Sequence, residues 1–139
     1  MTGWWTWSWR NGTRSSFFRM VGMDKNLTIL LNRGPFVSEY ADLALKMAIK
    51  AREKGYGVNL YLYVDGVWAP HIKSQKPFAN VGQRLRDALA LGVNVKVCNR
   101  CADARDVVSG DVIEGIPLVG LFDFTEWLHS SDRVLTFTG

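Results

Sequence analysis

Residues 93–105 read VNVKVCNRCADAR and contain both cysteines of the chain. The first five residues are mostly valine, as in a short buried strand, and the residues after Cys98 have a composition typical of a helix. Cys98 therefore lies where a strand is expected to end and a helix to begin. A strand that runs directly into a helix is the repeating element of an α/β fold, so the fold class can be worked out from this junction in both directions.

Apolar runs with the length of strands recur on both sides of this junction, and segments with helical periodicity separate them. The expected strands are Leu27–Leu31, Val58–Val64, Val93–Val97, Leu118–Leu121 and Val134–Phe137, and the expected helices are Ser38–Lys54, Val81–Leu91 and Phe124–His129. Helical connections of this length imply right-handed crossovers between parallel strands. We therefore predict an α/β fold, a three-layer sandwich with a mainly parallel sheet of about five strands.

The first 22 residues differ in composition from the rest of the chain. They hold four of the six tryptophans and three arginines, and they contain no acidic residue. They lack the continuous apolar core of a signal peptide, and no stretch of the chain has the length of a transmembrane helix. We expect residues 1–22 to be a loose extension, or to precede a true start at Met20 or Met23, and residues 23–139 to form a single domain.

Charge and cysteine content limit the class of protein. The net charge is +4, but outside residues 1–22 there are 14 basic and 13 acidic side chains, which is too balanced for a nucleic-acid-binding surface. Two cysteines three positions apart cannot staple the fold, so they fit a reducing compartment in which thiols do chemistry. We therefore expect a cytoplasmic protein without a cofactor that binds neither a membrane nor, directly, nucleic acid.

Ligands of parallel sheets bind beyond the carboxyl ends of the strands, where the cysteine segment and two further loops are expected. The loops 32–36 and 65–71 supply Asn32, Gly34, Asp65 and His71 as candidate binding residues. Asp65 before Gly66 is also typical of a simple turn, and a single loop histidine is usually solvated.

Cys98 is the candidate nucleophile. At the start of a helix its sulfur would lie near unpaired backbone N–H groups and the positive end of the helix dipole, and both favour a thiolate. Arg100 and Arg105 add positive charge nearby. Arg105 also follows Cys101 by four residues, which places the two on one helix face. We therefore select Cys98, Cys101 and Arg105 as candidate catalytic residues.

The two cysteines have other interpretations. A zinc site needs four ligands, and the two histidines, His71 and His129, lack a paired spacing, so we predict no metal site. A thioredoxin-like redox pair fits the Cys-x-x-Cys spacing, although the pair follows the third strand rather than the first. Free cysteine is also often simply buried. The residues alone leave the redox and the inert interpretations open.

The order of the motifs resembles the DsrE/DsrF/TusD-like sulfur relay family. The shared pieces are a strand followed by Gly34-Pro35, an alanine-rich helix ending near Lys54-Gly55, a strand running into Asp65-Gly66-Val67, the V-x-V-C sequence at Val95–Cys98, an arginine seven residues later, and D-R-V-x-x-F at Asp132–Phe137. Two positions depart from the TusD-like pattern. Asp106 replaces the usual glycine, and Cys101 replaces an alanine, although a Cys-x-x-Cys form occurs in other branches of the family.

The resemblance implies a DsrE-like domain that acts as a sulfur carrier or sulfurtransferase. Cys98 would hold a persulfide and pass its sulfur to a partner protein, and Arg105 matches the arginine of the family. If Cys101 resolves the persulfide, the protein is instead a thiol-disulfide redox protein or sulfur reductase. A non-catalytic structural subunit of a DsrE-type complex is the third interpretation.

The resemblance also implies partners. They are sulfur donor and acceptor proteins and further subunits of a homo- or hetero-oligomer, a trimer or hexamer. Apolar surface for such an assembly is expected from Tyr61, Tyr63, Trp68 and Phe78.

Overall fold

The computed structural model describes residues 25–36, 38–73 and 81–138. The strands are β1 (Asn26–Leu31), β2 (Gly57–Leu62), β3 (Asn94–Cys98), β4 (Leu118–Val119) and β5 (Arg133–Phe137). The helices are α3 (Tyr40–Glu53), α4 (Val81–Ala90), α5 (Asn99–Asp103) and α6 (Leu121–Ser130), with short 3₁₀ helices η1 (Val64–Trp68) and η2 (Ser109–Asp111). The extension predicted at residues 1–22, and Phe78, lie outside the described residues.

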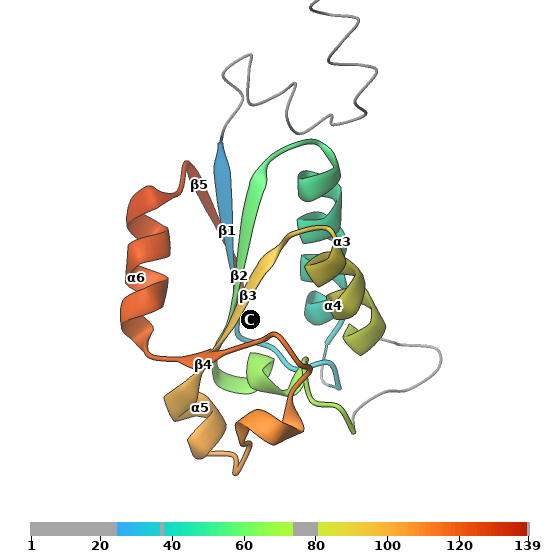
Figure 1. Ribbon diagram of the computed structural model, residues 1–139, viewed down its shortest axis with the longest axis vertical. Helices are drawn as coiled ribbons and strands as arrows, with labels where there is room; N and C mark the ends of the chain where they lie inside the picture. The colour runs from blue at the N-terminus through green and yellow to red at the C-terminus, as the bar shows by residue number, and fades with distance from the viewer. Residues whose placement is uncertain (1–24, 37, 74–80, 139) are drawn as a thin grey trace, which may run out of the picture.

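The five strands form one sheet in the order β4-β3-β2-β1-β5, and every neighbouring pair is parallel. Helices α3 and α4 cover one face of the sheet and α6 covers the other (Figure 1). Strands β1 to β4 are added one after another toward one edge of the sheet. The connection through α6 then leads back across the sheet, and β5 pairs with the other side of β1. The predicted α/β three-layer sandwich is therefore confirmed.

Helix α3 packs on the sheet through a stripe of small side chains. Ala41, Ala44, Leu45 and Ala48 are fully buried, with the i, i+3, i+4, i+7 spacing of one helix face. The strand opposite, β2, is buried without interruption from its second to its last residue. Such continuous burial is typical of an inner strand of a parallel sheet that is covered on both faces.

Two predicted strands end earlier than expected. Strand β2 stops at Leu62, because Val64 adopts a left-handed backbone conformation with φ of 52° and begins η1. Strand β4 is only two residues long and does not include Leu121, because Gly120 is the N-cap residue of α6. Both early endings place a new helical segment beside the cysteines.

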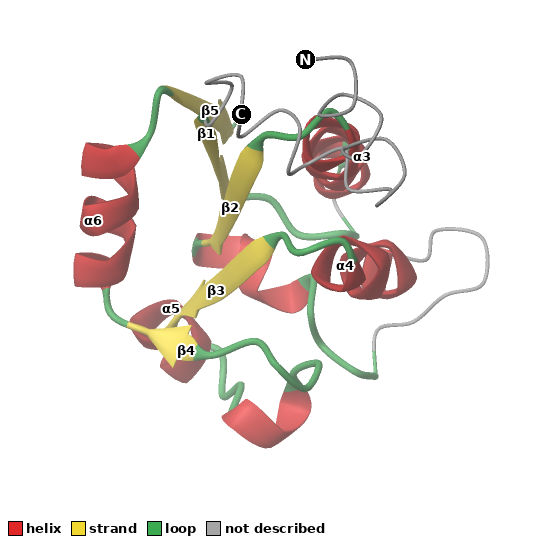
Figure 2. Ribbon diagram, turned by 45° about the horizontal axis from the view of Figure 1, so that its top comes forward, coloured by secondary structure: helices red, strands yellow, loops and turns green. Residues whose placement is uncertain are grey.

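The carboxyl ends of three neighbouring strands meet at one edge of the sheet. Strand β3 lies between β2 and β4. Strand β2 leads into η1, β3 into α5, and β4 into α6, as Figures 1 and 2 show. Cys98, the last residue of β3, is therefore flanked by the beginnings of three helical segments.

Candidate active site

Cys98 ends β3 and is the N-cap residue of α5. Its backbone is extended, and its Sγ accepts a hydrogen bond from the backbone N–H of Cys101 at 3.5 Å. Helix α5 is only five residues long, so its dipole is smaller than that expected for a longer helix. The environment of the Cys98 sulfur is therefore set mainly by individual hydrogen-bond donors.

The Cys98 side chain faces a cavity at the carboxyl edge of the sheet. Cys98 is only 3% exposed, so a reactant must enter this cavity to reach its sulfur. The cavity, called the thiol cavity below, has a volume of about 480 Å³. It is lined by Tyr63, Cys98, Asn99, Arg100, Cys101, Ala104, Arg105, Gly120 and Leu121. The fold thus brings the three candidate catalytic residues together at one opening.

Cys101 is half-buried and more accessible than Cys98, and both cysteines are free. Burial raises the pKa of the Cys101 thiol, and a hydrogen bond to Cys98 raises it further. The backbone N–H of Val64 and the charge of Arg105 act in the opposite direction, but the net shift is upward. Cys101 therefore keeps its proton at neutral pH and can donate it to the Cys98 sulfur.

The main chain of η1 also acts on the Cys101 sulfur. The backbone N–H of Val64 favours the thiolate of Cys101 and so lowers its pKa in part, and Val64 has the left-handed conformation described above. This conformation costs an L-residue about 1–2 kcal/mol, and it is rare for β-branched side chains. Strain of this kind often gathers at functional sites.

Arg105 connects η1 to α5. Its Nε donates to Oδ1 of Asp65 at 3.0 Å, and its Nη1 donates to the carbonyl of Cys101 at 3.1 Å. Asp65 itself does not line the thiol cavity. Its contact with the site is the hydrogen bond that it accepts from Arg105. The next residue, Asp106, has φ of 56°, so the turn keeps the left-handed conformation for which glycine is usual.

Two predicted binding residues lie beside the site without lining the thiol cavity. The N–H of Asn32 donates to the carbonyl of Phe137 at 3.1 Å, while its Oδ1 is buried without a hydrogen-bond partner among the described residues. Gly34 packs closely on η1, since a Cβ at Gly34 would lie 3.0 Å from the carbonyl oxygen of Asp65. Asn32 and Gly34 therefore hold the loop after β1 in place, and they do not contribute to the wall of the thiol cavity.

The two histidines are placed elsewhere. His71 pairs with Val112 in an isolated antiparallel bridge, and its Nδ1 accepts the N–H of Lys73 at 3.1 Å. His129 lies in the last turn of α6. Within residues 25–36, 38–73 and 81–138, no group of three or more His, Cys, Asp and Glu side chains is placed to hold a metal ion.

Tyr61 lies beside the site, although its sequence predicted an apolar surface position. It is fully buried on β2, its hydroxyl donates to the carbonyl of Gly120 at 3.3 Å, and the neighbouring Cys98 contributes to raising its pKa. Alternation along VNLYLYV places both of its tyrosines on one face of the sheet, which was the available signal. Its role could not be predicted because it depends on α6, which covers that face and begins earlier in the sequence than expected.

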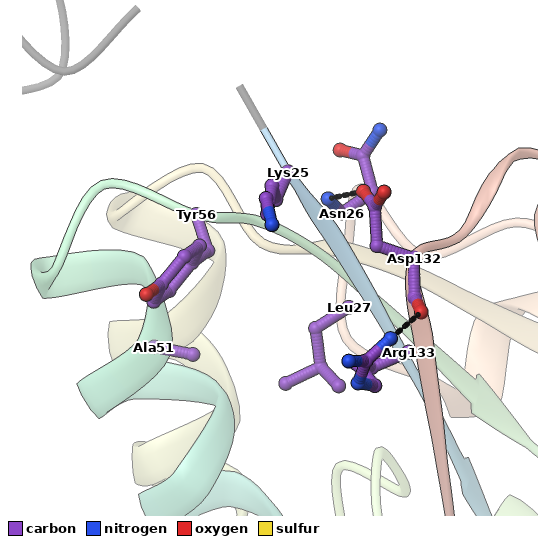
Figure 3. Close-up of a pocket in the computed structure, with 7 residues that line it drawn as sticks. All are labelled: Lys25, Asn26, Leu27, Ala51, Tyr56, Asp132 and Arg133. Atoms are coloured by element: carbon purple, nitrogen blue, oxygen red, sulfur yellow. Dashed lines mark hydrogen bonds between the residues drawn. The ribbon is translucent and has the colours of Figure 1, made fainter. Parts of the chain in front are cut away.

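A second pocket of about 330 Å³ lies at the opposite, amino edge of the sheet (Figure 3). It is lined by Lys25, Asn26, Leu27, Ala51, Tyr56, Asp132 and Arg133. Tyr56 and Ala51 are on one side of it and Asp132 and Arg133 on the other. The carboxylate of Asp132 already accepts the N–H of Asn26 at 2.8 Å. None of the candidate catalytic residues lines this pocket.

The raised pKa of Cys101 predicts a loss of stability at alkaline pH. Above the ordinary thiol value of 9.0 the unfolded chain releases this proton before the folded chain does, which favours unfolding. We expect the free energy of unfolding to fall as the pH rises from 9.0 toward the raised value, and to fall less in Cys101→Ser. Urea denaturation at several pH values measures both, and identical pH profiles would contradict the assignment.

The fold and the site define a class, a small parallel α/β domain with two free thiols at the carboxyl end of an inner strand. A match to the DsrE/DsrF-like family covers residues 25–137. The chain belongs to this family, which confirms the resemblance noted in the sequence.

Relatives of similar sequence and structure support this assignment to the family. Uncharacterized protein MJ0989 of Methanocaldococcus jannaschii is 36% identical over 112 residues, which are 79% of this chain and 97% of that protein. Protein YchN of Escherichia coli is 32% identical over 117 residues, which are 81% of this chain and 99% of that protein. The crystal structure of YchN superposes with a TM-score of 0.75 at 33% identity, over 81% of this chain and 99% of that chain. MTH1491 of Methanobacterium thermoautotrophicum, at 15% identity and a TM-score of 0.66 over 82% of this chain and all of that one, shares the fold.

Proposed function

We propose that this protein is a sulfur carrier that holds a persulfide on Cys98 and passes the sulfur to a cysteine of a partner protein. The observation that carries the proposal is the Cys98 sulfur itself, which faces the thiol cavity and accepts a hydrogen bond from the backbone N–H of Cys101. Such donors stabilise a negatively charged sulfur, the form that attacks and leaves in persulfide exchange. Membership of the DsrE/DsrF-like family supports the same chemistry.

Each half of the proposed reaction moves one sulfur between thiolates. In loading, the Cys98 thiolate attacks the outer sulfur of a donor persulfide, and the donor leaves as a thiolate. In transfer, the thiolate of the acceptor attacks the outer sulfur on Cys98, and the bond to Sγ of Cys98 breaks to regenerate the thiolate. Arg100 and Arg105, which line the cavity, supply positive charge for these anions.

A sulfur reductase is the second candidate, favoured by the position of both thiols in one cavity. In that reaction the Cys101 thiolate attacks Sγ of the Cys98 persulfide, a disulfide forms and hydrosulfide leaves. The raised pKa of Cys101 disfavours this step at neutral pH, because the attacking sulfur must first lose its proton.

The direct test is the intact mass of the protein after incubation with a sulfane-sulfur donor. A carrier gains the mass of one sulfur atom, and a thiol acceptor removes it again. A protein that gains no sulfur, and only loses two hydrogens as it forms a disulfide on oxidation, would contradict the proposal.

The exposed face of α6 is the surface that we assign to assembly with other subunits. No side chain of α6 is fully buried, and Leu121, Phe122 and Leu128 are 52%, 84% and 39% exposed. Leu121 also lines the thiol cavity, so a protein docked on this face would lie next to the cysteines. Neighbouring exposed apolar side chains of this size are typical of protein interfaces.

Phe122→Asp is expected to weaken self-association at least about tenfold, because a central aromatic side chain commonly dominates an interface. Sedimentation velocity over a range of concentrations measures the effect. Leu91→Asp is the matched control, because Leu91 is also exposed, at 40%, but follows α4 on the other side of the sheet. A native protein that remains monomeric, or equal association of the two variants, would contradict this use of α6.

A reducing compartment such as the cytoplasm suits a carrier that keeps two free thiols close together. Within the part of the chain that the structure describes, no helix is long and apolar enough to cross a membrane.

A further inference from the structure

We propose that Tyr61 is a catalytic residue whose hydroxyl donates a hydrogen bond to the Cys98 sulfur whenever that sulfur is anionic, and that it thereby speeds sulfur loading and transfer. The catalytic part of this inference rests on the proposed function. The hydrogen bond can be tested without any sulfur chemistry.

The register of β2 and β3 explains how Tyr61 reaches the cysteine. Tyr61 is paired with Lys96, so their side chains emerge on the same face of the sheet. Cys98, two residues further along β3, emerges on that face as well. The Tyr61 hydroxyl lies 3.3 Å from the carbonyl oxygen of Gly120, and both Gly120 and Cys98 line the thiol cavity.

Packing fixes the tyrosine ring. Tyr61 is fully buried and stacks on Phe124 with 4.9 Å between ring centroids, while Trp127 meets it edge-on at 6.5 Å. Both of these rings belong to α6, which Lys96 ties to β3 through Asp123 at 2.8 Å. The oxygen of the hydroxyl is therefore held in place, and only its proton is free to rotate.

This single proton has two acceptors. Beside a neutral Cys98 thiol it is directed to the carbonyl of Gly120, whereas a thiolate is the stronger acceptor and attracts it. Burial raises the pKa of Tyr61, and the hydrogen bond to Cys98 raises it further. The phenol thus stays protonated at neutral pH, which makes it a permanent donor and not a base.

The donor acts on the charge that changes during the reaction. When the acceptor thiolate bonds to the outer sulfur, the bond to Sγ of Cys98 breaks and its electron pair moves onto Sγ. The Tyr61 hydroxyl stabilises this new charge without giving up its proton. In loading, the same bond stabilises the Cys98 thiolate that attacks the donor persulfide.

The test compares Tyr61→Phe with Tyr56→Phe, each in a Cys101→Ser background in which Cys98 is the single thiol. Tyr56 is the matched control, because it lines the pocket at the opposite edge of the sheet and does not line the thiol cavity. The rate of alkylation by iodoacetamide at a fixed neutral pH reports how readily the Cys98 thiolate forms. We expect Tyr61→Phe to slow alkylation roughly tenfold and Tyr56→Phe to leave the rate unchanged.

The second readout is the rate of sulfur transfer from the loaded protein to a small thiol, which we expect Tyr61→Phe to slow at least about tenfold at neutral pH. Phenylalanine keeps the ring stacking, and circular dichroism checks that the fold is retained. An unchanged alkylation rate in Tyr61→Phe would overturn the inference. A native protein that takes up no sulfur would overturn the proposed function instead, while the alkylation rates would still decide whether Tyr61 donates to Cys98.

Discussion

Cys98→Ser is expected to abolish the uptake of sulfur, whereas Cys101→Ser is expected to leave uptake intact. Both cysteines line the thiol cavity, so access to the cavity does not distinguish them. Their surroundings do, because the Cys98 sulfur accepts the backbone N–H of Cys101, whereas burial and the neighbouring Cys98 raise the pKa of the Cys101 thiol. A thiol that keeps its proton is a poor nucleophile.

Intact mass of the two variants after the same donor treatment measures the difference. The native protein and Cys101→Ser should each gain one sulfur atom, and Cys98→Ser should gain none. Serine is close to cysteine in size, and thermal unfolding of each variant checks that the fold persists. Sulfur that stays on Cys98→Ser and disappears from Cys101→Ser would reverse the roles of the two thiols, in keeping with the greater exposure of Cys101.

Cys101→Ser also separates a carrier from a sulfur reductase. A reductase releases hydrosulfide when Cys101 attacks the Cys98 persulfide, so the native protein should release it and Cys101→Ser should not. A carrier releases none in either form until an acceptor thiol is added. Hydrosulfide from the loaded native protein at neutral pH would therefore favour the reductase, despite the raised pKa of Cys101.

Much of the fold was predictable because its determinants are local in the sequence. Apolar runs of strand length and helical periodicity are read within a few residues, and they placed all five strands and the junction at Cys98 correctly. The ends of β2 and β4 were missed for physical reasons. The left-handed conformation of Val64 is imposed by tertiary contacts against the preference of valine, and Gly120 caps a helix after only two strand residues.

The contacts that build the site were less predictable because they join distant parts of the chain. Asp65 and Arg105 lie 40 residues apart and meet only because η1 and α5 follow neighbouring strands. The burial of Tyr61 depends on where α6 crosses the sheet. The spacing of the two cysteines could be predicted to matter from the sequence. The hydrogen-bond donors around each sulfur could be identified only from the three-dimensional structure.

Gly66→Ala is expected to lower the free energy of unfolding by roughly 3 kcal/mol, the upper range for forcing extra atoms into a packed interior. A Cβ at Gly66 would lie 2.2 Å from the carbonyl oxygen of Leu31. That oxygen cannot move aside cheaply, because it accepts the N–H of Tyr63 at 3.0 Å where β1 and β2 end. The substitution must therefore separate η1 from the sheet or break this backbone hydrogen bond.

Gly110→Ala is the matched control, since a Cβ at Gly110 would meet no atom of the described residues within 4 Å, and its effect should stay within about 0.5 kcal/mol. Urea denaturation of both variants measures the difference. Because η1 carries Val64 and Asp65, which contact Cys101 and Arg105, a displaced η1 should also change the alkylation rate of Cys101. If the two variants unfolded at the same urea concentration, the close approach of η1 to β1 could not be what holds these groups beside the thiols.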